Sequence, residues 1–157
     1  MRFATKQDIE APIRAVFDSL TDFETWERAA MRRGAEVDRI DRIAGIAPGM
    51  TWQTQFQYRS KARKLRLELT HIETPHHLAF AARSEVLDGS AQIELLELGA
   101  KRTRLHVVVE ITPRTLTARL FLQSLRLARA RVHRKFDQRI AHFAALIETQ
   151  HRGSRPF

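Results

Sequence analysis

The chain contains few of the side-chain arrangements that support catalysis. It has no cysteine, which excludes disulfides, thiolate metal sites and cysteine nucleophiles. Its seven histidines show no metal-binding spacing: His76 and His77 are adjacent in a turn, and His133 and His142 lie on opposite sides of the helix expected there. Neither a Gly-rich phosphate loop nor a nucleophile elbow is present. We therefore expect no metal and no other cofactor.

One histidine has a pattern around it that could support proton transfer. His71 continues the alternation of Leu65, Leu67 and Leu69, which predicts that it points to the inward side of a strand. An imidazole titrates near neutral pH, so at the edge of a cavity it could act as a general acid or base. The alternative is a hydrogen-bonded histidine at a strand end with a structural role.

The elements that would position such residues follow one another in a clear order. Residues 2–9 alternate as a half-buried strand does. Apolar residues at helical spacing predict a helix over 13–20 and a second over 23–33, which Gly34 ends. The period then changes to two, and turn residues separate six strands, predicted over 35–43, 50–59, 62–73, 77–86, 90–98 and 101–112. This succession predicts an antiparallel meander with one dry and one wet face.

Helical periodicity returns after Pro113 and holds to about residue 150, which predicts one long C-terminal helix. A chain of 157 residues that is 43% hydrophobic suits one domain with a real core. We assign this domain to residues 1–151 and expect 152–157 to be a disordered tail. The first residues lack an apolar signal core, and no apolar run is long enough to span a membrane. We therefore expect a cytoplasmic protein.

This order of elements resembles the START-like superfamily, also called SRPBCC or helix-grip, of the polyketide cyclase/dehydrase and coenzyme Q-binding type. Residues 9–17 resemble its strand-to-helix entry and residues 20–26 its second helix. Residues 49–52 fall where the family has a Gly-aromatic strand start, and residues 101–105 where it has a Thr-containing last strand. The resemblance covers nearly the whole chain. It implies an α+β helix-grip fold, β-α-α-β6-α, in which a curved antiparallel seven-stranded sheet wraps around a long C-terminal helix.

The resemblance also implies a class of function. Members of this superfamily include lipid carriers, coenzyme Q-binding proteins and polyketide cyclases, which share an apolar cavity between the sheet and the long helix. We therefore expect the chain to bind or carry an apolar small molecule, lipid-like or aromatic, in such a cavity. The alternative is a cyclase- or hydrolase-like enzyme of the same fold acting on a polyketide-like or aromatic substrate. Its polar groups would be residues such as Tyr58, Arg63, His71 and Arg129.

The candidate ligand-binding residues are those expected on the dry face of the sheet and on the facing helix stripe. They are Trp52, Phe56, Tyr58, Leu67, Leu69, His71, Phe80 and Val107 on the sheet, and Arg129, Val132 and Phe136 on the helix. For each apolar residue taken alone, ordinary packing in the core also explains an inward position. Arg129 differs, because a guanidinium in the middle of an apolar stripe needs a partner. That partner is water or a protein carboxylate reached by the long side chain, or else an acidic group of the ligand.

The outer side of the last helix combines apolar and basic residues. The formal net charge is +9, and much of the excess lies between residues 115 and 139. Leu116, Leu120 and Leu127 form an apolar line bordered by Arg131 and Arg134. Such a line is typical of a helix on an anionic membrane surface, and a homodimer contact or a solvated face would also explain it. We do not expect nucleic-acid binding, because no recognisable binding motif is present.

Overall fold

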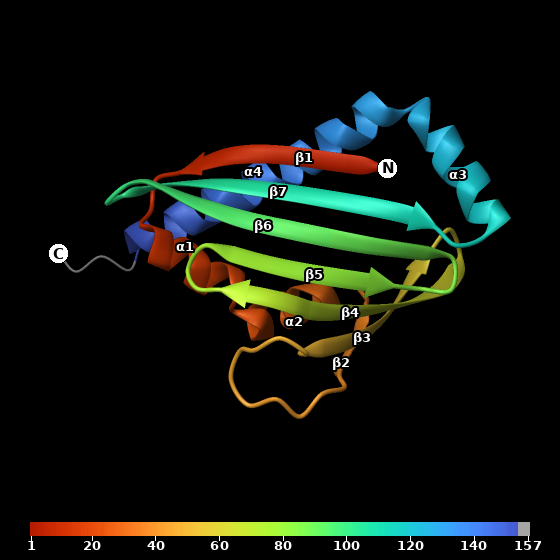
Figure 1. Cartoon of the computed structure of the whole chain (residues 1–157), viewed down its shortest axis with the longest axis horizontal. Helices are drawn as coiled ribbons and strands as arrows, with labels where there is room; N and C mark the ends of the chain where they lie inside the picture. The colour runs from red at the N-terminus through yellow and green to blue at the C-terminus, as the bar shows by residue number, and fades with distance from the viewer. Residues whose placement is uncertain (154–157) are drawn as a thin grey trace.

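A computed structural model describes residues 1–153. The elements follow in the order β1 (Arg2–Ile9), α1 (Ile13–Leu20), α2 (Phe23–Arg32), β2 (Glu36–Arg39), β3 (Thr51–Tyr58), β4 (Lys61–Glu73), β5 (His77–Arg83), β6 (Leu87–Gly99), β7 (Arg102–Pro113), α3 (Leu116–Arg126) and α4 (Arg129–Gly153). All strands join one antiparallel sheet in the order β1-β7-β6-β5-β4-β3-β2 (Figure 1). The predicted helix-grip fold is confirmed. The predicted tail begins within α4 at residue 152, and its residues 154–157 lie outside the described residues.

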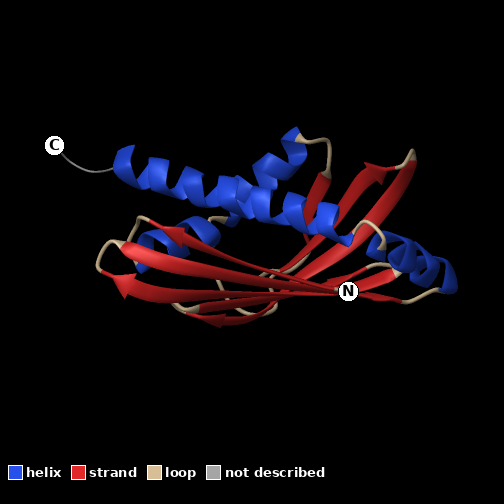
Figure 2. Cartoon of the chain, turned by 90° about the horizontal axis from the view of Figure 1, so that it is seen from above, coloured by secondary structure: helices blue, strands red, loops and turns tan. Residues whose placement is uncertain are grey.

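The helices that cover the sheet lie on one of its two faces. Figure 2 shows α1, α2 and α4 on one side, which we call the concave face, while the other side, the outer face, carries no helix. Side chains of α1 pack into the concave face because Ile13, Val16, Phe17 and Leu20 repeat at helical spacing and are all buried. The most deeply buried residues there include Ile9, Leu105 and Ile147. The core is therefore densest where α1 and the C-terminal part of α4 meet the sheet.

The segment between β2 and β3 is a loop rather than the longer strand predicted over 35–43. Asp41 holds this loop against the sheet, because its carboxylate accepts the backbone N–H groups of Ile43 at 2.9 Å and Thr51 at 2.8 Å. The Arg39 guanidinium also donates to this carboxylate. The hydrogen bond from Arg39 holds the pKa of Asp41 well below its usual range, and the two backbone donors act in the same direction. One carboxylate thus replaces the strand pairing that this segment lacks.

The predicted single C-terminal helix is in fact two helices. The chain changes direction after Arg126, where the N–H groups of Leu127 and Ala128 bond to carbonyls three residues back, at 3.2 and 3.0 Å. This tightened turn ends α3, and α4 then runs along β1 (Figure 1). Ala118 and Leu122 bury α3 near β7, whereas the buried residues of α4 are Ala144 and Ile147. Each helix packs on a different part of a curved sheet, so one straight helix cannot satisfy both contacts.

Candidate functional site

The concave face brings together most of the apolar residues predicted to bind a ligand. Cross-strand pairs share a face of the sheet, and Trp52 pairs with Leu67 while Leu69 pairs with Phe80. Trp52, Leu69 and Val107 are buried in the core, and Leu67, Phe80 and Phe136 pack against it while remaining partly exposed; Val132 is partly exposed too. Close backbone contacts of α4 with the sheet are made to β1. The helix therefore leaves part of the concave face of β3 to β6 uncovered.

An aromatic cluster from three elements lies on this face. The ring of Phe23, from α2, meets Trp52 edge-on with ring centroids 5.0 Å apart, and it lies 6.3 Å from Phe80. Trp52 donates its indole N–H to the Glu27 carboxylate at 2.7 Å, and the Arg39 guanidinium stands 5.5 Å from the Trp52 ring. The indole is thus held by packing, a hydrogen bond and a cation–π contact. Sequence reasoning did not select Phe23, although the amphipathic phase of α2 marks it as inward-facing.

The concave face is open at the end formed by the β3–β4 hairpin. Phe56 and Tyr58 on β3 are 37% and 47% exposed. Arg59 and Ser60 turn the chain with positive φ angles of 52° and 62°, which suits a two-residue hairpin loop. The Arg59 guanidinium then reaches the Phe121 ring of α3, 5.0 Å from its centroid. The hairpin tip and α3 therefore meet beside the exposed aromatic residues.

Arg63 is a basic residue of this open end. It pairs with Phe56 across β3 and β4, so it points to the concave face. Its Nε is buried and has no hydrogen-bond partner, and no ion pair to Arg63 occurs within residues 1–153. In the sequence, Arg63 was predicted only as a polar group of the enzyme alternative. In the sequence, Arg63 alternates with Leu65 and Leu67, and this pattern predicts that all three point to the same face of the sheet.

Arg129 does not point to the interior, and that expectation is wrong. The residue is exposed: its guanidinium donates to the carbonyl of Arg2 at 3.1 Å and stands 5.9 Å from the Phe3 ring. His133, one turn later, bonds through its ring to the carbonyl of Ala4 at 3.0 Å. Both side chains cover the free edge of β1, which has β7 on its other side only. The break before α4 explains the error, because the projected stripe assumed one continuous helix.

His71 lies on the outer face, so the inward orientation predicted for it is also wrong. The pairing of β4 with β5 shifts between Leu69 and His71, where Leu69 faces Phe80 and His71 faces Ala79. Thr70 is the extra residue of this bulge, and its hydroxyl donates to the carbonyl of Ala79 at 3.1 Å. A one-residue shift exchanges the faces of all later side chains. The side chain of His71 is therefore 55% exposed.

Two depressions of the described chain are lined by residues outside α4. One, of about 670 Å³, lies on the outer face beside His71. The other, of about 290 Å³, lies between α3, Met1 and Pro113. Neither depression lies between the sheet and α4, where the ligand cavity was expected. The candidate binding surface is the partly exposed concave face.

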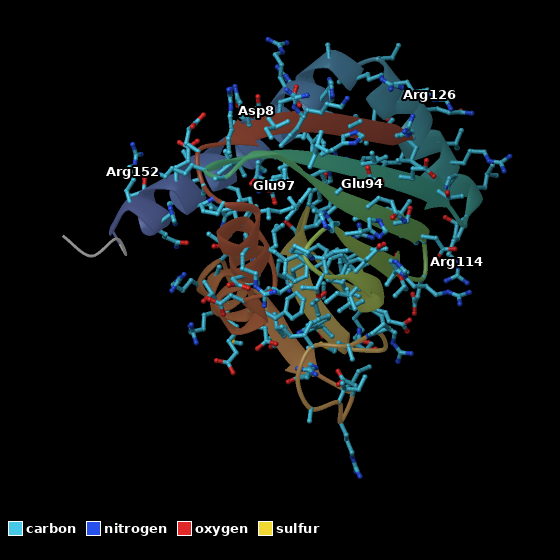
Figure 3. All side chains as sticks on the ribbon, turned by 60° about the vertical axis from the view of Figure 1, so that its left-hand side comes forward. Asp8, Glu94, Glu97, Arg114, Arg126 and Arg152 are labelled. Carbon is cyan, nitrogen blue, oxygen red and sulfur yellow. The ribbon has the colours of Figure 1, made fainter. Side chains whose placement is uncertain are left out.

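The predicted apolar line on the last helix is exposed. Leu116, Leu120 and Leu127 are 72%, 58% and 94% exposed, and Arg131 and Arg134 beyond the break are exposed as well. The sequence of α3 contains no acidic residue. Figure 3 shows Arg126 extending outward from the end of α3. Within residues 1–153, no helix is both long and apolar enough to cross a membrane.

Comparisons with known proteins agree with this architecture. Residues 1–148 match the family described as polyketide cyclase/dehydrase and lipid transport. No curated protein sequence matches the chain. Solved structures do: a protein from Thermus thermophilus (TM-score 0.67, 13% identity, covering 99% of this chain and 100% of that one) and the Zhui aromatase/cyclase from a Streptomyces species (0.63, 14%, 92% and 93%). A START superfamily protein from Mycobacterium smegmatis also matches (0.58, 10%, 87% and 97%).

These structures share the fold at low sequence identity, whereas the family match extends over nearly the whole chain and confirms the resemblance seen in the sequence. The chain belongs to the family described as polyketide cyclase/dehydrase and lipid transport.

Proposed function

We propose that the concave face binds an apolar, lipid-like or aromatic small molecule that carries an acidic or other electron-rich oxygen group, with Arg63 as its anchor. The observation that carries this proposal is the buried Nε of Arg63, which has no hydrogen-bond partner. A buried donor without a partner costs about 1–3 kcal/mol. A ligand oxygen would remove that cost, and the planar fork of arginine suits carboxylate, phosphate and enolate groups.

The apolar part of the ligand would lie along the partly exposed side chains of the same face. Phe56 and Tyr58 border Arg63, while Leu67 and Phe80 continue toward the core. Val132 and Phe136 of α4 would cover the ligand from the helix side. Trp52, Leu69 and Val107 are buried and would form the floor of the site. Binding would remove these exposed apolar surfaces from water, which supplies the main driving force.

Entry would take place where the β3–β4 hairpin meets α3. A cation–π pair between Arg59 and Phe121 joins the hairpin to α3 there, and such a pair is worth about 0.5–1 kcal/mol at an exposed site. Such a weak contact can open without disturbing the core at the other end of the molecule. The hairpin tip is therefore the segment whose movement would admit a ligand.

The test compares an acid with its neutral analogue. Arg63→Met removes the charge and keeps the bulk, and Arg66→Met removes the same charge from the exposed outer face of the same strand. A fluorescent fatty acid should bind Arg63→Met at least about tenfold more weakly, equivalent to about 1.4 kcal/mol. The corresponding fatty alcohol should bind both variants nearly as well as the original protein. Equal losses for acid and alcohol, or no saturable binding by the original protein, would contradict the proposal.

We favour a carrier over a cyclase- or hydrolase-like enzyme because of where His71 lies. This histidine was the acid–base candidate, and the register shift in β4 puts it on the face opposite the proposed ligand. An enzyme at the concave face would have to use Tyr58 or Glu27 for proton transfer. Mass spectrometry of a polyketide-like probe after incubation with the protein distinguishes the two functions. A carrier returns the probe unchanged, whereas a cyclised or dehydrated product would show that the enzyme alternative is correct.

We also propose that α3 rests on an anionic lipid surface. Leu116 and Leu120 are exposed on this helix and Leu127 is exposed at its C-terminal end, and Arg119 and Arg126 are the only charged residues of α3. A lipid surface buries the leucines and attracts the arginines. A two-fold dimer through the same face would bring the arginines of the two copies together, and like charges in contact oppose association. The charge pattern therefore favours a membrane over a second copy.

Vesicle sedimentation tests this second proposal. The protein should sediment with vesicles of phosphatidylcholine and phosphatidylglycerol and be released as the salt concentration rises, because each basic residue near the surface contributes about 1 kcal/mol that salt screens. Replacing Leu120 and Leu127 by Ser should weaken sedimentation, while Leu146→Ser, an exposed leucine on α4, should not. Equal binding to purely zwitterionic vesicles, or a dimer in light scattering that the two serines abolish, would contradict it.

A further inference from the structure

The β4–β5 hairpin places potential metal ligands from two strands on the outer face of the sheet. His71 and Glu73 are two residues apart on β4, so they share a face. Glu73 pairs directly with His77 on β5, and His71 pairs with Ala79. The shift at Thr70 is what puts His71 on this face beside the other two. The arrangement therefore arises from cross-strand pairing, which no linear spacing of histidines reveals.

The three side chains lie close enough to share one ion. One ligand atom from each of His71, Glu73 and His77 lies within 4.8 Å of the other two. His71 Nε2 is 4.0 Å from a carboxylate oxygen of Glu73, and the rings of His71 and His77 have centroids 5.0 Å apart. Ligands at the usual zinc distances stand about 3.3 Å from one another in a tetrahedron. Small side-chain rotations would close the remaining gap, and exposed side chains make such rotations freely.

A further contact orients one of the rings. His77 Nε2 lies 2.7 Å from the side-chain oxygen of Gln92 on β6. In the tautomer in which Nε2 donates to that oxygen, Nδ1 has a free lone pair that can bind a metal ion. A hydrogen bond of this kind to the second ring nitrogen is how metal-bound histidines are usually held. Gln92 would thus support His77 as a ligand from the neighbouring strand.

The surroundings leave room for the ion's remaining ligands. The depression of about 670 Å³ on this face includes His71, Glu73 and His77 in its lining. Water can therefore complete the coordination. Arg104 in this lining is paired with Asp8, at 2.8 Å. Two imidazoles and one carboxylate do not suit Ca²⁺ or Mg²⁺, which prefer oxygen ligands.

We propose that His71, Glu73 and His77 form a binding site for a divalent transition metal ion on the outer face of the β4–β5 hairpin. Two imidazoles and one carboxylate suit Zn²⁺, Ni²⁺ or Cu²⁺. The ion would join β4 to β5 next to the turn, on the face opposite the proposed ligand site. This site is independent of the proposed function, so either can fail without the other.

Calorimetric titration of untagged protein with Zn²⁺ tests the site. We expect one ion per chain, with affinity reduced at least about tenfold in His71→Ala and in His77→Ala, since even indirect changes around a metal cost that much. Glu73→Gln should weaken binding as well, and Gln92→Ala by a smaller factor. Zn²⁺ should also raise the Tm of the original protein, and at the same Zn²⁺ concentration raise that of His71→Ala by less, because an ion that binds more weakly stabilises the fold less.

Two controls make the result specific. His142→Ala changes an exposed histidine on α4 and should bind Zn²⁺ as the original protein does. His106→Ala removes a histidine of the same depression that pairs instead with Glu94, at 3.9 Å, and it should retain binding. Zn²⁺ affinity that is unchanged in both His71→Ala and His77→Ala would overturn the proposal, as would loss of binding in His106→Ala alone. All four histidines are partly or fully exposed, so circular dichroism should show each variant folded.

Discussion

The two ends of the concave face are built differently. At the closed end, where α1 and the C-terminal part of α4 meet the sheet, Ile9 and Leu105 are fully buried and Ile147 is 1% exposed. At the open end, where the β3–β4 hairpin meets α3, Phe56 and Tyr58 are more than a third exposed, and the Nε of Arg63 lacks a partner. The same sheet carries both ends, so its strands alone do not decide which end is packed.

The difference shows how one small domain can combine stability with binding. At the closed end, α1 and the C-terminal part of α4 cover the concave face, and apolar side chains fill the space between these helices and the sheet. At the open end, the apolar side chains of Phe56 and Tyr58 stay partly exposed beside Arg63, whose Nε has no hydrogen-bond partner. Surface that is not used for folding remains available for a ligand. The closed end would therefore determine stability and the open end binding.

The largest expected effect tests that division directly. Leu105→Ala at the closed end should lower the free energy of unfolding by about 3 kcal/mol, because it leaves a cavity among fully buried side chains. Phe56→Ala at the open end removes a larger side chain but should cost only about 1 kcal/mol, since that ring is already partly in water. Urea denaturation measures both. Similar losses for the two variants would show that the ends are equally packed.

A smaller effect concerns the loop before β3, which depends on Asp41. The pKa of this carboxyl is lowered in the folded protein by Arg39 and two backbone donors. Its contribution is therefore present above the unfolded pKa of about 3.9 and is lost as the pH falls toward the folded value. Asp41→Asn should lower the Tm clearly at pH 7, and the difference from the original protein should shrink as the pH falls below about 4. A difference that does not depend on pH would mean that the charge of Asp41 is irrelevant.

The third effect has the opposite sign. Without a ligand, Arg63→Met should raise the free energy of unfolding by about 1 kcal/mol, because it replaces a buried, unpartnered donor with an apolar side chain. Arg66→Met on the outer face should leave stability almost unchanged. Thermal unfolding of both variants measures the contrast. A loss of stability in Arg63→Met comparable to that of Leu105→Ala would show that Arg63 is a packed structural residue.

The smallest effect concerns the edge of β1. Arg129→Met removes one hydrogen bond to the carbonyl of Arg2, and we expect it to cost less than about 1 kcal/mol because the guanidinium is exposed. Its affinity for the fluorescent fatty acid should equal that of the original protein. If Arg129→Met weakened binding of the fatty acid but not of the fatty alcohol, Arg129 rather than Arg63 would be the anchor of the ligand.

Most of the fold could be predicted because each local pattern agrees with the tertiary structure. Alternation placed Trp52, Phe56 and Leu67 on one face, and cross-strand pairing confirms that they share it. The short helix α1 was recognisable from the spacing of its four buried apolar residues. Periods of two and 3.6 residues arise from backbone geometry itself. Strands and helices can therefore be recognised in the sequence without knowledge of the tertiary contacts.

The site was less predictable, because its residues are positioned by irregularities. An extra residue at Thr70 moved His71 to the outer face and brought it to Glu73 and His77. A break at Leu127–Ala128 moved Arg129 from the projected interior to the edge of β1. Both errors come from continuing a regular period across a point where the backbone departs from it.

The sequence by itself therefore determined the order of elements, the dry and wet faces of the meander and the exposed basic character of α3, because these depend on residue periodicity and charge. Only the tertiary structure decided that Arg63 lacks a partner, that the last helix bends to follow a curved sheet, and that histidines of two strands converge. Those features depend on which atoms of distant segments come within a few ångströms of one another, and a linear pattern does not contain that information.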